Sequence, residues 1–351
     1  MTKHPNLPPG YWRLLISRRQ VQAAGVLVGL ATVALVGYAV GFTDILATIQ
    51  TLSVRQTLVL VGIGLVPLGL WGVGLWLALD AIGATTALPR AVLLFCVSLF
   101  FNSVTPFGQA GAAPLSGGVI AHAVRSPYER ALAAIGGLNA INTLATLCLW
   151  VLGGATLAAS GETTGARGSV IVATIGVAGT AVAVVLGWRA RATLARFVTR
   201  ALASTLAVAG RFAPRWSAPP ATAVADRVDG FVAAIERLAA SRRRLVGILC
   251  LVVAGQLTVV FVLYTALTFL SDPAFAAVLF VVPLSRTATA VPTPGGIGGA
   301  EALLTSLLVT VAGTSPVVAG AATVLYRVTA FWIPALIGGV GAAGLLLGSR
   351  R

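Results

Sequence analysis

The sequence has few charged residues for its length. Charged residues make up only 9% of the 351 residues, hydrophobic residues make up 58%, and the mean hydropathy is +0.96. A soluble domain of this size does not need so much apolar surface, whereas about 20 consecutive apolar residues suffice to cross a bilayer. The shortage of charge therefore excludes a soluble fold and predicts an all-α polytopic membrane protein.

Histidine and cysteine are too scarce and too dispersed to build a metal or redox centre. The two histidines are His4 and His122, and the three cysteines lie in separate apolar segments without a CxxC spacing: Cys96, Cys148 and Cys250. Free cysteine in such surroundings packs as a small hydrophobic residue. We expect no bound metal and no cofactor.

Acidic residues are scarcer than basic ones, which gives a formal net charge of +15. Such a charge can indicate nucleic-acid binding, but the arginines lie between hydrophobic segments, without interleaved aromatic residues or a known binding motif. We expect no nucleic-acid partner and interpret the arginines as topology signals.

Six uninterrupted apolar segments approach or exceed the length of a membrane span. The first follows three arginines and lacks the small-residue cleavage site of a signal peptide, so we interpret it as an uncleaved span. The six predicted spans are residues 23–42, 57–79, 131–159, 168–188, 245–270 and 316–347.

Two further apolar segments are interrupted by prolines and glycines. Residues 91–124 break at SVTPFGQAGAAP, and residues 274–312 break at PTPGGIGGAEALL. Free backbone groups at membrane depth are tolerated only beside protein or water, so we expect both breaks to face an interior cavity. The arm 91–104 would reach only about 21 Å into a core of about 30 Å. The pattern predicts two re-entrant helical hairpins.

The arginines also predict the orientation of the chain. If both hairpins return to their own side, most basic residues are cytoplasmic, including eleven arginines in the loop 189–244. This places the protein in the plasma membrane with both termini in the cytoplasm. Apolar residues recur at helical spacing between Val224 and Leu238, which favours a helix on the membrane surface; a plain basic tether is the alternative.

The two breaks are similar to each other at an offset of 188 residues. TPFGQAGA at 105–112 and TPGGIGGA at 293–300 share five of eight residues. Each half also holds two spans, a broken hairpin and a further span, so the second half would be inverted relative to the first. We therefore predict inverted repeats at 1–160 and 161–351, an arrangement typical of secondary transporters.

The breaks are candidate binding sites for an anion. A helix that restarts near Ile297 exposes unpaired N–H groups and the positive end of its dipole, and glycine allows a phosphate to approach them. The alternative is that the glycines only permit close helix packing. The candidate residues in the breaks are Thr105, Pro106, Gly108, Gly111, Pro294, Gly295, Gly296 and Gly298.

Three ionisable residues lie within hydrophobic segments: Arg286, Glu301 and Arg327. Charges at membrane depth are costly and mark functional sites, and this set leaves a net positive charge that suits a phosphate. Glu301 could carry a coupling proton or could pair with Arg327 as a helix clamp. Asn102 and Asn139 could line the same cavity or bond between helices.

The stretch PTPGGIGGAEALL, with LYRVTAFWIP after it, resembles the membrane domain family of lysylphosphatidylglycerol synthases, and FNSVTPFGQAGAAPL resembles its first-half counterpart. The resemblance spans nearly the whole chain. It implies movement of a lipid with a polar headgroup, either an aminoacylated phospholipid or a polyprenyl-linked sugar. Where the family pattern leads us to expect an acidic and a basic residue, this sequence has Ala113 and Asn139. The resemblance assigns binding roles to Pro294, Gly295, Gly296, Gly298, Glu301 and Arg327.

These features favour a lipid transporter, or flippase, that binds an anionic headgroup. An intramembrane enzyme is the weaker alternative, because Ser116 and His122 lack a GxSG context. Only four residues follow position 347, so the soluble aminoacyl-transferring domain of the fused synthases has no room and we expect no enzyme activity. A non-catalytic partner of a lipid-modifying enzyme stays open as a third class, and a homo-oligomer stays open as an assembly.

Overall fold

The computed structural model describes residues 41–105, 108–159, 221–286 and 293–348, with isolated positions between 171 and 200. These ranges contain helices and connecting turns and no strand. The elements are α3 (Phe42–Gln50), α4 (Val54–Ala81), α5 (Leu88–Val104), α6 (Gly108–Val124), α7 (Tyr128–Ala159), α10 (Ala221–Ala240), α11 (Arg242–Thr268), α12 (Phe275–Ser285), η2 (Pro294–Gly296), α13 (Gly299–Thr310), α14 (Pro316–Arg327), η3 (Val328–Trp332) and α15 (Ile333–Gly348).

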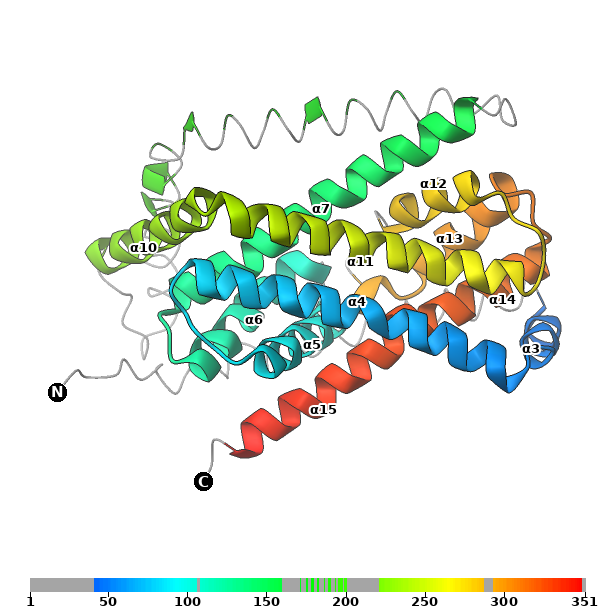
Figure 1. Cartoon of the computed structure of the whole chain (residues 1–351), viewed down its shortest axis with the longest axis horizontal. Helices are drawn as coiled ribbons and strands as arrows, with labels where there is room; N and C mark the ends of the chain where they lie inside the picture. Colours follow the sequence, from blue (N-terminus) through cyan, green and yellow to red (C-terminus); the bar gives the residue numbers. More distant parts are fainter. Residues whose placement is uncertain are drawn as a thin grey trace, which may run out of the picture.

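Four helices are long and apolar enough to cross a membrane. They are α4 with 28 residues, α7 with 32, α11 with 27, and the continuous helix Pro316–Leu345 with 30, which joins α14, η3 and α15 (Figure 1). A helix of 27 residues measures about 40 Å, more than the ~30 Å hydrocarbon core. Four of the six predicted spans thus coincide with helices of sufficient length and hydropathy, and spans 23–42 and 168–188 lie outside the continuously described residues.

Four shorter apolar helices occupy the two interrupted segments. Helices α5 and α6 have 17 residues each, while α12 has 11 and α13 has 12. At 1.5 Å per residue, even 17 residues measure only about 26 Å, less than the hydrocarbon core. Both predicted breaks are therefore present, and the re-entrant arrangement of the two helix pairs stays a prediction.

Backbone conformation explains why the helices end where they do. Thr105 after α5 is extended, with φ −101° and ψ 135°, as expected for a residue that precedes proline. In the second break, Gly295, Gly296 and Gly298 have φ angles of 62°, 69° and 84°. A side chain is disfavoured at such angles, so these three glycines provide the turn between α12 and α13.

The two halves of the chain interlock. Helices α4 and α11 run side by side in opposite directions (Figure 1), α12 packs on α7, and α5 packs on α15. In each half, therefore, a short helix (α5 or α12) packs on the last long helix of the other half (α15 or α7). Two glycines allow the approach, because Gly153 lies against the backbone of Leu279 and Phe280, and Gly338 lies against the carbonyl of Cys96. The element order repeats between the halves, and their inversion stays a prediction.

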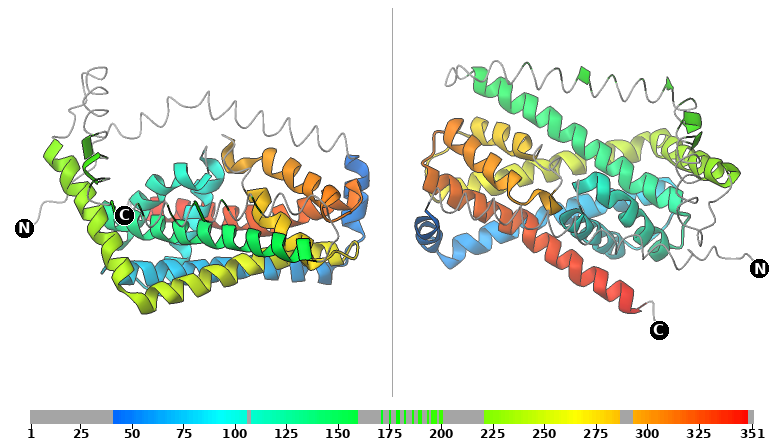
Figure 2. Two further views of the ribbon diagram at one scale, coloured as in Figure 1. Left: turned by 90° about the horizontal axis from the view of Figure 1, so that it is seen from above. Right: turned by 180° about the vertical axis from the view of Figure 1, so that it is seen from behind.

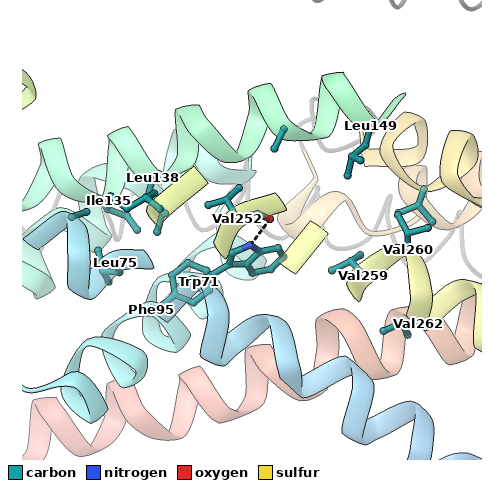
Figure 3. Close-up of a cluster of buried hydrophobic side chains, with 14 of the residues drawn as sticks. Trp71, Leu75, Phe95, Ile135, Leu138, Leu149, Val252, Val259, Val260 and Val262 are labelled. Atoms are coloured by element: carbon teal, nitrogen blue, oxygen red, sulfur yellow. Dashed lines mark hydrogen bonds between the residues drawn. The ribbon is translucent and has the colours of Figure 1, made fainter. Parts of the chain in front are cut away.

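A buried apolar cluster fills the centre of the bundle around Trp71 (Figure 3). The Trp71 indole N–H donates to the carbonyl of Val252 on α11 at 3.4 Å, and the ring lies 5.9 Å from that of Phe95 on α5. Gly255 lies directly against the indole, so no larger side chain fits there without movement. Trp71 therefore fixes α4 relative to both α5 and α11.

Helix α10 confirms the helical stripe predicted in the loop 189–244, but its apolar face packs on protein. Leu238 is buried against Gly137 of α7, and Arg227 lies 3.7 Å from Glu129 at the start of α7. The helix lies at one end of the bundle (Figure 2). The sequence pattern alone could not distinguish this contact from a membrane surface, because both bury one apolar face.

Candidate functional site

A cavity of about 650 Å³ lies between the broken segments and the long helices. Its walls come from both halves of the chain, through α4, α5, α6, α7, α11, α12, α13, α14, η3 and α15. Many of the side chains are polar although the helices that carry them are apolar. The polar lining residues are Ser98, Asn102, Ser116, Asn139, Asn142, Thr143, Thr146, Ser285, Arg286, Tyr326 and Arg327.

Arg327 joins the end of α14 to the start of α13. Its Nε donates to Oε1 of Glu301 at 2.7 Å, and its Nη2 donates to the carbonyl of Gly295 at 3.2 Å. The guanidinium also lies 4.1 Å from the ring centre of Phe331, a favourable cation–π distance. Arg327 is buried and lines the cavity, so the positive charge and the second break meet at one place.

Glu301 occupies the positive end of α13. Its Oε2 accepts the backbone N–H of Gly298 at 2.7 Å, three residues earlier in the chain. Both carboxylate oxygens are therefore bonded, one to a helix start and one to Arg327. The sequence predicted an anion at this helix start, and in the structure the anion there is the chain's own carboxylate.

Arg286 ends α12 and belongs to a polar network that crosses three helices. Its Nη1 donates to Oε1 of Gln256 on α11 at 2.7 Å. The Gln256 amide then donates to Asn142 at 2.7 Å and to Thr146 at 2.9 Å, both on α7. The guanidinium also lies 6.0 Å from the Trp71 ring centre. The hydrogen bonds through Gln256 therefore hold the Arg286 side chain in place at the cavity wall.

Gln256 and Asn142, which connect Arg286 to α7, were not among the residues predicted from the sequence. The available signal was an amide within the apolar run LCLVVAGQLTVV, because an amide at membrane depth needs a hydrogen-bond partner. Asn102 and Asn139, named from the sequence, both line the cavity. Their side chains make no hydrogen bond to any residue that the structure describes.

Part of the predicted first break lies outside the described part of the chain. Pro106 lies outside the described residues, and Gly108 opens α6 but its surroundings are outside the described part. Thr105 and Gly111 are described and are not among the lining residues, whereas Ala112 and Ala113, directly after Gly111, are. The two breaks do lie together, because Gly295 lies against the carbonyl of Ser103 near the end of α5. In the second break, the side chain of Pro294 is outside the described part, and Gly296 and Gly298 are buried.

The charges of the second break have neutral counterparts in the first half. At the offset of 188 residues, Glu301 corresponds to Ala113 and Arg327 to Asn139, and both neutral residues line the cavity. The second half therefore supplies cations and the first half supplies uncharged groups. Among the described residues, no group of three His, Cys, Asp or Glu side chains could hold a metal ion.

A π-helical turn, η3, begins directly after Arg327. Such turns are often found at functional sites because they interrupt the regular hydrogen bonding of a helix. Ala330 and Phe331 from this turn line the cavity.

Comparison with known proteins identifies one matching family. The family model described as "Lysylphosphatidylglycerol synthase TM region" matches residues 22–338. No curated protein matches the chain. The matched range contains both breaks, α7 and all three charged residues of the site.

Proposed function

Since the chain belongs to the lysylphosphatidylglycerol synthase TM-region family, we propose that it moves a lipid with a polar, phosphate-containing headgroup between the two leaflets of the membrane. The protein is a multi-pass membrane protein with several apolar helices. The proposal assigns it transport of a lipid and no enzymatic reaction.

One observation carries the proposal: a polar cavity with two arginines lies inside a bundle of apolar helices. Polar and charged groups at membrane depth are costly and mark substrate pathways. The volume of 650 Å³ falls in the range of about 300–1,000 Å³ that is usual for small-molecule sites. A headgroup fits such a cavity while its acyl chains stay in the lipid.

Arg286 and Arg327 suit a phosphate on electrostatic grounds. Their guanidinium groups line one cavity, and the N–H donors of arginine match phosphate oxygens in geometry. The Gln256 network holds Arg286 at the wall, so little side-chain entropy is lost when an anion binds.

The geometry of α6 gives no support to an intramembrane hydrolase. Ser116 lines the cavity, whereas His122 is exposed and is not a lining residue. A serine nucleophile needs a base within hydrogen-bond reach, and these two residues lie on different faces of one helix.

Reconstitution tests the proposal. The full chain is placed in phosphatidylcholine vesicles that contain a trace of acyl-labelled fluorescent phosphatidylglycerol, and an impermeant reductant bleaches the label in the outer leaflet. The protein should render more than the outer-leaflet share of the label accessible. Gln256→Glu should slow this movement, because a carboxylate beside Arg286 competes with the headgroup phosphate.

The matched control is Gln56→Glu, the same exchange at the exposed start of α4, where Gln56 belongs to the capping box with Ser53. It should leave the movement unchanged. Lipid movement no faster than in empty vesicles would refute transport, and equal rates for native protein and Gln256→Glu would refute the role of Arg286.

A further inference from the structure

One face of α7 presents uncharged polar groups to the cavity. Asn139, Asn142, Thr143, Thr146 and Trp150 recur at helical spacing, and all of them line the cavity. Over these residues the helix rises about 16 Å, roughly half of the hydrocarbon core. The stripe therefore extends along the direction in which a headgroup would move.

Part of this stripe has no partner within the described chain. Asn142 and Thr146 are engaged by Gln256, but the Asn139 amide makes no hydrogen bond to any described residue, nor does the Asn102 amide on α5. The buried indole N–H of Trp150 also lacks an acceptor in the described part. Unpaired polar groups at membrane depth cost free energy, so their persistence points to a polar ligand.

The charges of the cavity restrict what that ligand can be. Arg286 and Arg327 line it, and none of the described lining residues is Asp or Glu. The nearby Glu301 carboxylate is already bonded to Arg327 and to the Gly298 amide. An ammonium group would meet the Arg286 cation and the Arg327–Glu301 ion pair, with no carboxylate available among the described lining residues, which is unfavourable in a low-dielectric site.

We propose that Asn102, Asn139, Thr143 and Trp150 form a polyol subsite, which binds the uncharged, hydroxyl-rich part of a headgroup whose phosphate lies at Arg286. The inference rests on the proposed function, because the headgroup must enter the cavity. The substrate class is a phosphorylated polyol, such as a glycerol or sugar phosphate, carried on a lipid. Cationic aminoacylated headgroups are excluded.

The chemistry of hydroxyl groups fits this subsite. Each hydroxyl donates one hydrogen bond and accepts others, and an asparagine amide offers both donors and an acceptor. Asn139 occupies the position in the first half that corresponds to Arg327 in the second half. Because Asn139 is neutral, this wall of the cavity carries no charge. A site that hydrogen-bonds hydroxyl groups discriminates strongly against a ligand that lacks them, because its polar groups then stay unpaired.

Lipid binding to the purified full chain tests the inference by native mass spectrometry and thermal shift. Phosphatidylglycerol is compared with phosphatidic acid, which lacks the polyol, and with lysylphosphatidylglycerol, which is cationic, all with the same acyl chains. We expect phosphatidylglycerol to bind about tenfold more tightly than either lipid, the factor for roughly one net hydrogen bond between uncharged groups. Glycerol 3-phosphate at millimolar concentration should not stabilise the protein.

Two variants and one control locate the subsite. Asn139→Leu and Thr143→Val should each weaken phosphatidylglycerol binding and leave phosphatidic acid binding unchanged. Thr156→Val is the control: Thr156 lies on the same helix, its hydroxyl also donates to a helix carbonyl, and it does not line the cavity. This control should bind all three lipids like the native protein.

Several results would overturn the inference. The inference fails if phosphatidylglycerol does not bind, or if lysylphosphatidylglycerol or phosphatidic acid binds as tightly. It also fails if Asn139→Leu and Thr143→Val weaken the binding of phosphatidylglycerol and of phosphatidic acid equally. Binding of glycerol 3-phosphate as tight as that of the lipid would assign the cavity to a soluble ligand. Because the readout is binding, a protein that binds with the expected selectivity but moves no lipid would refute the proposed transport and leave the subsite intact.

Discussion

The Nε atom of Arg327 lies 2.7 Å from Oε1 of Glu301, which joins two helices across 26 residues of sequence. The second carboxylate oxygen accepts the Gly298 N–H, so one side chain both pairs a buried arginine and caps a helix start. Both partners are largely buried, with side-chain exposures of 9% and 14%. Removing either partner would leave the other charge without compensation.

Arg327→Ala should destabilise the protein by about 3–5 kcal/mol, because it leaves the Glu301 charge buried and unpaired. Chemical or thermal unfolding in detergent measures the change. The double variant Arg327→Ala/Glu301→Ala should recover most of this loss, since no uncompensated charge remains. Equal stability of Arg327→Ala and the native chain would show that the pair contributes nothing to the fold.

The same double variant separates a structural role of Arg327 from a substrate contact. If Arg327 contacts the headgroup phosphate, lipid movement in the vesicle assay stays lost even when stability returns. Recovery of movement by the double variant would identify the pair as a helix clamp and reject the ligand role.

Sequence reasoning reached much of this fold because apolar length and helix breakers are local signals. The spans around α4, α7, α11 and α14–α15 follow from hydropathy, and both breaks follow from proline and glycine. The family also follows from the motif in the second break.

Contacts between distant residues could not be predicted in the same way. Gln256 and Asn142 are 114 residues apart, and no local pattern says that their helices face each other. Gly137 likewise carries no signal that Leu238 of α10 will pack on it. The site is therefore predictable as a set of charged residues, but its hydrogen-bond network depends on tertiary packing.

Gly153→Ala should destabilise the packing of α7 on α12. A Cβ at Gly153 would lie 2.5 Å from the backbone nitrogen of Phe280, and backbone cannot move away as a flexible side chain can. Overpacking of this kind costs about 1–3 kcal/mol. Gly136→Ala on the same helix is the control: nothing lies within 4 Å of its Cβ position, so it should be neutral or stabilising. Unfolding in detergent compares the two, and equal stabilities would mean that the helices do not cross at Gly153.

The two ends of α11 should lie on opposite sides of the membrane, with Ala240 in the cytoplasm and Ser271 outside, as the positive-inside rule predicts. Both positions are exposed, and they flank a helix of 27 residues. In a cysteine-free background, an impermeant thiol reagent applied to intact cells should label Ser271→Cys and spare Ala240→Cys. The reverse pattern would invert the orientation. Positions 163 and 218, which the sequence also assigns to the outer and inner sides, lie outside the described residues.

Gly298→Val should stop lipid movement while the protein stays inserted in the membrane. Gly298 is buried with φ 84°, so valine strains the backbone by roughly 1–3 kcal/mol and displaces the N–H that Glu301 accepts. The hydrophobic segments that direct insertion are unchanged. Gly296→Val, at φ 69° in the same break, should act alike.

Gly313→Val is the control that makes this last prediction decisive. Gly313 has a similar φ of 65°, but nothing lies within 4 Å of its Cβ position, and it is an exposed residue in the turn before α14, away from the cavity lining. Valine there carries comparable backbone strain without touching the second break. Lipid movement should therefore be lost in Gly298→Val and kept in Gly313→Val, with both proteins inserted and monodisperse in detergent. If a correctly inserted Gly298→Val protein moves lipid at the native rate, the glycines serve only to pack helices, and the start of α13 takes no part in handling the headgroup.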